Sequence, residues 1–154
     1  MQSETISSVE QLSYLLDEAD SAITTLANAS AYLHDLLPRI NWVGFYLLEE
    51  GELRLGPFQG KPACTRIAPG NGVCGTALVE NQTQRVEDVH AFPGHIACDS
   101  ASNSELVVVL HKQNGEPFGV LDIDSPLLGR FSEEDARDME RAAEIISAKI
   151  RHDA

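Results

Sequence analysis

Hydrophobic residues recur every three to four positions near the start of the chain, a spacing typical of an amphipathic helix. Between residues 7 and 27 these positions are Val9, Leu12, Leu15, Leu16, Ala19, Ile23 and Leu26. A second, shorter helix is predicted over residues 29–37, because Pro38 follows and cannot continue it. Near the other end, Ser132 and Asp135 fit a capping box, which opens a last helix. Helices are therefore expected at both ends.

The middle of the chain alternates between hydrophobic and polar or small residues, which favours β-strands. The predicted strands span residues 41–48, 53–55, 105–111 and 117–124. The first two are joined by a turn at residues 49–52. Asn114-Gly115 joins the last two, and this dipeptide is the strongest short signal for a β-hairpin.

Two long segments show no regular pattern. Residues 57–72 are interrupted by several prolines and glycines, and residues 88–103 also lack a period, so both are predicted to be loops. A short helix over residues 72–79 lies between them. Together these elements predict an α+β domain, in which the terminal helices pack on one face of an antiparallel sheet. The two loops would cover a pocket on the other face.

Side chains alternate between the two faces of a strand, so the strands also predict what lines the pocket. The face opposite the helices would carry Trp42, Gly44, Tyr46, Glu105, Val107, Val109, Phe118, Val120, Asp122 and Asp124. Two aromatics beside three carboxylates suit a small ligand that is partly cationic and partly apolar. Alternatively, Asp122 and Asp124 lie at a hydrated strand end, and Trp42 and Tyr46 are ordinary core residues.

Composition and charge narrow the class of protein. Of the 154 residues, 43% are hydrophobic and 23% charged, which is typical of a globular protein. The formal net charge of −13 disfavours nucleic acid and anionic membranes as partners. No apolar run is long enough for a membrane span, and residues 1–10 lack the features of a signal peptide. We therefore expect one domain over residues 1–154, located in the cytoplasm.

The chain contains three cysteines, Cys64, Cys74 and Cys98, an odd number that cannot form a closed disulfide framework. All three lie in or beside the predicted loops, whereas inert cysteines usually pack among aliphatic residues. This placement indicates redox chemistry. A metal site using His90, His95, Cys98 and Cys64 is less favoured, because the spacing matches no known ligand pattern, and we predict no bound metal.

Cys74 falls in the first turn of the predicted helix over residues 72–79. The helix dipole and the free backbone N–H groups at this end would favour a thiolate. By this argument alone, Cys74 is the first candidate for the nucleophile.

The chain also contains three characteristic stretches: GPFQGKPACTRI, GNGVCGTALVENQTQRVEDVHAFPGHIACDSASNSELVVVL and GVLDIDSPLLGRFSEED. Together they resemble the free methionine-(R)-sulfoxide reductases, a family built on a single GAF domain. The resemblance runs from about Asn41 to Asp135. It implies a GAF-like fold and reduction of free L-methionine (R)-S-oxide to L-methionine. It also implies thioredoxin or a similar dithiol as the external reductant, no resident cofactor, and a part in the response to oxidative stress.

The resemblance makes Cys98 the nucleophile, which passes through a sulfenic acid. It makes Cys64 a resolving cysteine and gives Cys74 a resolving or auxiliary part, so it ranks Cys98 above Cys74. Which of Cys64 and Cys74 forms the disulfide with Cys98 stays open.

The resemblance also assigns the pocket residues. Trp42 and Tyr46 match the aromatic wall around the substrate methyl group, and Glu105, Asp122 and Asp124 match the acidic pocket. A carboxylic acid beside apolar residues has a raised pKa, so Glu105 is our candidate general acid. Asp122 and Asp124 would hold the substrate ammonium.

Two other functions fit a GAF-like fold. One is a non-catalytic sensor of a small ligand, which usually belongs to a longer chain with an output domain. The other is a cysteine-based redox sensor that turns over no substrate. The sequence leaves the oligomeric state open and is compatible with a homodimer.

Overall fold

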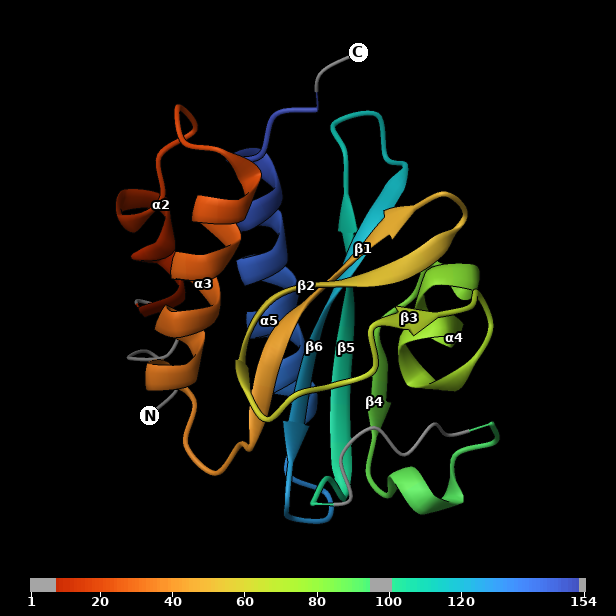
Figure 1. The fold of residues 1–154 in the computed structure, drawn as a ribbon. Helices are drawn as coiled ribbons and strands as arrows, with labels where there is room; N and C mark the ends of the chain where they lie inside the picture. Colours follow the sequence, from red (N-terminus) through yellow and green to blue (C-terminus); the bar gives the residue numbers. More distant parts are fainter. Residues whose placement is uncertain (1–7, 95–100, 153–154) are drawn as a thin grey trace.

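In the computed structural model, which describes residues 8–94 and 101–152, a six-stranded antiparallel sheet forms the centre of the molecule (Figure 1). Its strands are β1 (Trp42–Glu49), β2 (Glu52–Gly60), β3 (Arg66–Ile67), β4 (Gln84–Val86), β5 (Ser104–His111) and β6 (Pro117–Ser125). Their order across the sheet is β3-β2-β1-β6-β5-β4. The helices are α2 (Leu12–Leu15), α3 (Ala22–Leu36), α4 (Gly72–Glu80), the short 3₁₀ helix η1 (Val89–Ala91) and α5 (Glu133–Ala148).

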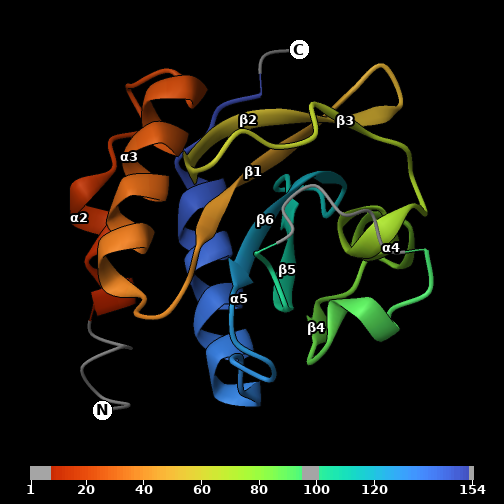
Figure 2. The same ribbon diagram turned by 60° about the horizontal axis from the view of Figure 1, so that its bottom comes forward.

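The helices lie on both sides of this sheet. Figure 2 shows α2, α3 and α5 on one side and α4 on the other. The predicted α+β fold, with N- and C-terminal helices on one face, is therefore confirmed. The capping box of α5 is present as predicted, since Ser132 accepts from the backbone N–H of Asp135 and Asp135 accepts from that of Ser132.

Each face of the sheet has its own hydrophobic core. The core under the terminal helices includes Val43, Phe45, Leu106, Val108, Leu121 and Ile123. The core on the other face includes Trp42, Tyr46, Val107, Val109 and Val120. This division confirms the alternation predicted from the strands, with one exception. Phe118 was expected beside Val120 but belongs to the helix-side core, near the shift in β5–β6 pairing at Leu110/His111.

The N-terminal helices do not have the predicted boundaries. The first is interrupted after α2, because Asp17 accepts from the backbone N–H of Ala19 and turns the chain. Ser21 then caps a new helix by accepting from Thr24. Such local bonds from Asp and Ser compete with a continuous helix. The predicted break near residue 28 is absent, and α3 ends before Pro38 as expected.

The loop predicted over residues 57–72 is also partly wrong. Strand β2 continues through Pro57 to Gly60. A shift in the β1–β2 register between Gly44 and Tyr46 forms a bulge, and proline is tolerated at such positions. Strand β3 follows within the same segment and pairs with β2. Tertiary pairing therefore outweighs the loop-forming tendency of this composition.

Gly44 leaves room for the aromatic side chains above β1. A Cβ atom built there would lie 2.3 Å from Cβ of Phe58 and 2.8 Å from Cη2 of Trp42. Because both neighbours are held in the sheet, we expect Gly44→Ala to lower the free energy of unfolding by about 1–3 kcal/mol. Urea titration followed by the emission of Trp42, the single tryptophan, measures this change. A change below about 0.5 kcal/mol, the range of ordinary surface substitutions, would show that the aromatics are not tightly packed.

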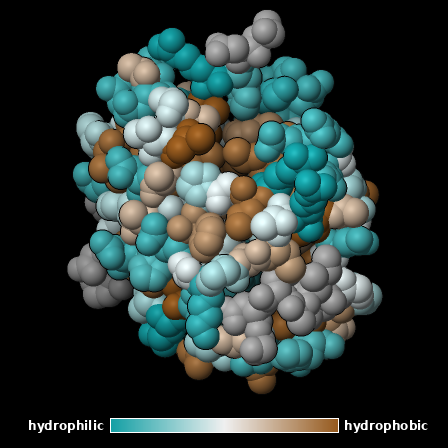
Figure 3. All heavy atoms as spheres, viewed as in Figure 1, coloured by the Kyte–Doolittle hydropathy of each residue, from teal (hydrophilic) through white to brown (hydrophobic). Residues whose placement is uncertain are grey.

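The surface is mixed in character. On the face seen in Figure 3, hydrophilic residues predominate toward the rim and apolar residues gather toward the middle. Within residues 8–94 and 101–152, no helix combines the length and the apolar composition needed to cross a bilayer.

Candidate active site

The strand register places the predicted pocket residues side by side. Trp42 pairs with Asp124, and Asp124 pairs with Glu105, which makes one row across β1, β6 and β5. In the next row, Asp122 lies between Gly44 and Val107. Since residues paired across strands share a face, the aromatics and all three carboxylates occupy one face of the sheet.

The aromatic wall is a stack of three rings. The Trp42 ring lies 6.0 Å from that of Tyr46 and 5.2 Å from that of Phe58, with interplanar angles of 25° and 17°. Nε1 of Trp42 donates to the carbonyl oxygen of Lys61 at 3.0 Å. The sequence pattern does not reveal Phe58, because the prolines and glycines around it predict a loop. Leu53 and Leu55 alternate with polar residues, and extending this pattern past a bulge would have predicted that Phe58 lies on the same face of the strand.

Tyr46 connects this wall to a cysteine. Its hydroxyl donates to the carbonyl oxygen of Cys64 at 2.9 Å. Cys64 is partly buried between β2 and β3 and is disulfide-bonded. The backbone at Cys64 is therefore fixed against the aromatic wall.

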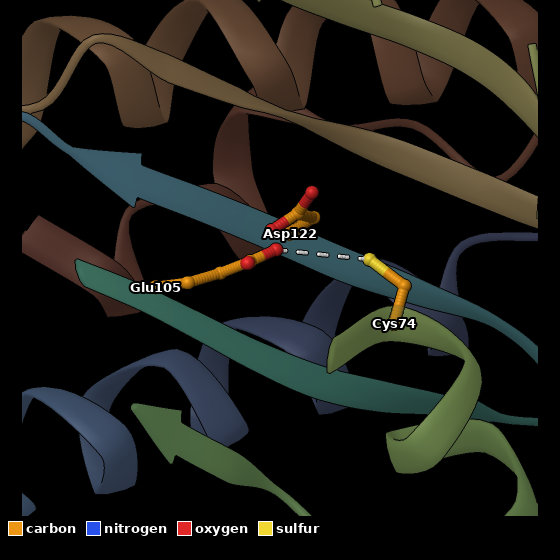
Figure 4. Close-up of side chains that lie close together, drawn as sticks. All are labelled: Cys74, Glu105 and Asp122. Carbon is orange, nitrogen blue, oxygen red and sulfur yellow. Dashed lines mark hydrogen bonds between the residues drawn. The ribbon is translucent and has the colours of Figure 1, made fainter. Parts of the chain in front are cut away.

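The carboxylates meet the second cysteine at the centre of this face. Figure 4 shows Cys74 from α4 pointing toward Glu105 of β5, with Asp122 of β6 beside them. Sγ of Cys74 donates to Oε2 of Glu105 at 4.0 Å. All three side chains are buried, with 4%, 8% and 5% of their residue surfaces exposed, whereas Asp124 is half-buried.

Burial governs the protonation of this cluster. It raises the pKa of Glu105 well above its usual range, and the charges of Asp122 and Asp124 raise it further. Burial also raises the pKa of Asp122, but hydrogen bonds from Glu105 and Cys74 oppose the rise. Burial therefore favours the protonated form of both carboxyl groups, and at Glu105 the neighbouring carboxylates favour it further. A buried carboxyl group with a raised pKa can carry the proton that a general acid donates.

The same surroundings correct the prediction of a thiolate at Cys74. Burial raises the pKa of its thiol well above the usual range, and the charges of Asp122, Glu105 and Asp124 add to the rise. A helix terminus stabilises an anion by about 1 kcal/mol, less than one pKa unit, whereas full burial shifts a pKa by up to about 3–5 units. Cys74 is a free thiol and is held as the neutral S–H.

The remaining predicted residues lie in the segment before β5. Cys98 and His95 fall outside the described residues. His90 lies in η1, where its Nε2 makes a 2.9 Å hydrogen bond with Oδ1 of Asn103. The expectation that two long loops cover the pocket stays a prediction.

The chain is similar to known proteins in both sequence and fold. The sequence pattern of the GAF domain matches residues 11–150. The free methionine-R-sulfoxide reductase of Escherichia coli is 63% identical over 115 residues, which are 75% of this chain and 69% of the relative. The chain belongs to the free methionine-R-sulfoxide reductase family.

Solved structures of this reductase family have the same fold. The fRMsr of Staphylococcus aureus in complex with substrate is 48% identical, with a TM-score of 0.89, and covers 96% of this chain and 95% of its own. The free methionine-R-sulfoxide reductase of Neisseria meningitidis in complex with its substrate is 43% identical, with a TM-score of 0.85. That match covers 92% of this chain and 84% of the relative. Membership of the family places this chain among enzymes.

Proposed function

We propose that this protein reduces free L-methionine (R)-S-oxide to L-methionine through a cysteine nucleophile. The observation that carries the proposal is the bond from Tyr46 to the carbonyl of Cys64. It sets a disulfide-bonded cysteine beside a wall that also holds three carboxylates. The substrate complexes of the Staphylococcus aureus and Neisseria meningitidis relatives support the same substrate here.

Different residues of the pocket bind different groups of the substrate. The stacked rings of Trp42 and Tyr46 contact the apolar methyl group of the sulfoxide. Asp122 and Asp124 hold the ammonium group, which is protonated at neutral pH. A methionine within a peptide has an acylated nitrogen without this charge, so the acidic pocket selects the free amino acid.

The chemical step transfers oxygen from the substrate sulfur to a cysteine sulfur. The Cys98 thiolate attacks the sulfoxide sulfur, and Glu105 donates a proton to the sulfoxide oxygen. Collapse moves the hydroxyl group to Cys98 and releases methionine, so the substrate is reduced by two electrons and Cys98 becomes a sulfenic acid. The raised pKa of Glu105 supports its role, because the group must carry a proton at neutral pH.

Cys64 then resolves the sulfenic acid. Its thiolate attacks the Cys98 sulfur, the S–S bond forms as the S–O bond breaks, and the hydroxide takes up a proton and leaves as water. Two observations support Cys64 over Cys74: Cys64 is disulfide-bonded, and Cys74 is a free thiol whose pKa is raised. Because the chain has three cysteines, we assign Cys98 as the partner of Cys64. An external dithiol such as thioredoxin restores both thiols by exchange, and no resident cofactor takes part.

A stereochemical assay tests the proposal. The protein is incubated with free methionine-(R,S)-sulfoxide and dithiothreitol, and both epimers are followed by chiral chromatography. We expect the R-epimer to disappear and the S-epimer to remain. A small-ligand sensor or a redox sensor would consume neither epimer catalytically, so persistence of both would refute the proposed function.

Replacing the resolving cysteine is expected to preserve a single turnover of the enzyme but to impair repeated turnover with thioredoxin. Cys64→Ser retains the nucleophile and the acid, so it forms one methionine per chain, but its thioredoxin-coupled turnover falls at least about tenfold. Rapid quench and steady-state assays measure the two quantities. Cys74→Ser is the matched control and keeps the coupled turnover. If Cys74→Ser loses cycling and Cys64→Ser does not, the two roles are reversed.

A further inference from the structure

A cluster of potential metal ligands lies at the centre of the acidic face. Cys74, Glu105 and Asp122 each offer one ligand atom, and these atoms all lie within 4.8 Å of one another. They come from three different elements, α4, β5 and β6 (Figure 4). All three residues are buried, so the framework that holds them is packed rather than hydrated.

Asp122 gives a second and independent sign of a missing ligand. It is 5% exposed, and its Oδ1 atom is buried and has no hydrogen-bond partner among residues 8–94 and 101–152. A buried acceptor of this kind normally has a partner. Among the ion pairs between described residues, none includes Glu105 or Asp122. The cluster therefore has a buried acceptor atom and two carboxyl groups that no cationic side chain of the described residues pairs with.

We propose that Cys74, Glu105 and Asp122 bind one thiophilic divalent cation, of which Zn²⁺ is the best match. A sulfur ligand excludes Mg²⁺ and Ca²⁺, which prefer oxygen alone. Zn²⁺ sits about 2.3 Å from sulfur and about 2.0–2.2 Å from a carboxylate oxygen, so it bridges atoms roughly 3.5–4 Å apart. The 4.0 Å separation of Cys74 Sγ and Glu105 Oε2 requires only a small rotation.

Three protein ligands leave one position of a tetrahedral site open to water. The cation displaces the proton of the Cys74 thiol, so binding releases protons and tightens as pH rises. The metal supplies the positive charge that the cluster lacks. This set of ligands differs from the histidine-containing set disfavoured above and needs neither loop histidine.

One consequence rests on the proposed function. The cation would occupy the acidic pocket assigned to the substrate ammonium, and it would also remove Glu105 from its role as an acid. Zn²⁺ and methionine sulfoxide should then exclude each other. Zinc is on this view an inhibitor of the enzyme, competitive with the amino acid.

Metal binding is tested on the full chain without reductant, so that Cys64 stays in its disulfide and Cys74 provides the thiol. Cd²⁺ titration follows the ultraviolet band of thiolate-to-metal charge transfer, and calorimetry measures Zn²⁺. We expect one ion per chain. Cys74→Ser should remove the band, and both Cys74→Ser and Asp122→Asn should weaken Zn²⁺ binding at least about tenfold. Asp138→Asn, a buried carboxylate of α5 on the other face, should bind as the unaltered chain does.

A second measurement needs no substitution and so does not depend on the folding of any variant. Zn²⁺ should slow alkylation of Cys74 in the unaltered protein at least about tenfold, as measured by mass spectrometry of the Cys74 peptide. Unchanged alkylation, or a charge-transfer band that survives in Cys74→Ser, would overturn the proposed metal site.

Failure of the metal site can be told apart from failure of the proposed function. If the R-epimer is consumed but Zn²⁺ neither binds nor protects Cys74, the cluster serves the substrate alone and the metal proposal is wrong. If Zn²⁺ binds at Cys74 but the R-epimer is not consumed, the metal site stands and the reductase function does not.

Discussion

Cys98→Ser is expected to abolish methionine formation even in a single turnover. A serine hydroxyl is far less acidic than a thiol and cannot accept the substrate oxygen as a sulfenic acid, so the first bond does not form. Rapid mixing of excess enzyme with methionine (R)-sulfoxide, followed by quench and quantification of methionine, measures this step. The expected yield is at background.

Cys74→Ser is the control for this experiment, because it replaces with a hydroxyl the thiol that donates to Glu105. This variant should still form one methionine per chain, because the Cys74 thiol that it lacks is buried and neutral in the unaltered protein and is not the nucleophile. The opposite pattern, with Cys98→Ser active and Cys74→Ser inactive, would assign the nucleophile to α4. That result would support the thiolate at Cys74 that the helix dipole predicts.

Glu105→Gln is expected to lower kcat by about 10²–10⁴-fold, the usual contribution of a general acid. The amide keeps the size and the hydrogen-bonding capacity of the side chain but cannot donate a proton to the leaving oxygen. KM should change little, because Asp122 and Asp124 hold the ammonium. Asp138→Asn, at a buried carboxylate outside the pocket, should leave kcat unchanged. A loss of less than roughly fivefold in Glu105→Gln would exclude Glu105 as the acid.

The pH dependence gives a second readout of Glu105. Its pKa is raised, first by burial and then by Asp122 and Asp124. The protonated form of Glu105 is the active one, so the contribution of this acid should be complete below its raised pKa and should be lost as pH rises through it, which gives kcat an alkaline falling limb. This falling limb should be absent from the residual activity of Glu105→Gln. A limb that persists unchanged would belong to another group.

Local patterns were sufficient for most of the fold. The alternation in β1, β5 and β6 separates two faces, and the structure places the aliphatic set under the helices and Trp42 and Tyr46 on the other side. The hairpin at Asn114-Gly115 and the cap at Ser132 are equally local, because each depends on a few adjacent residues. Wrong predictions in the sheet are those in which distant contacts compete with local preference, whereas the N-terminal helix boundaries were missed because local bonds from Asp17 and Ser21 break the helix. Pro57 lies inside β2 because β1 pairs along it, and Phe118 turns to the helix side.

The amino-acid sequence by itself determined the two-faced sheet, the grouping of Trp42, Tyr46 and the three carboxylates, and the presence of Cys64 and Cys74 beside them. Only the tertiary structure decided the charge state of Cys74 and which described cysteine is disulfide-bonded. The reason is that a helix terminus acts over one turn, whereas Glu105 and Asp122 reach Cys74 from strands far along the chain. The desolvation of Cys74 and the charges around it depend on how these distant elements pack together. Their effect on the Cys74 pKa is larger than that of the helix dipole.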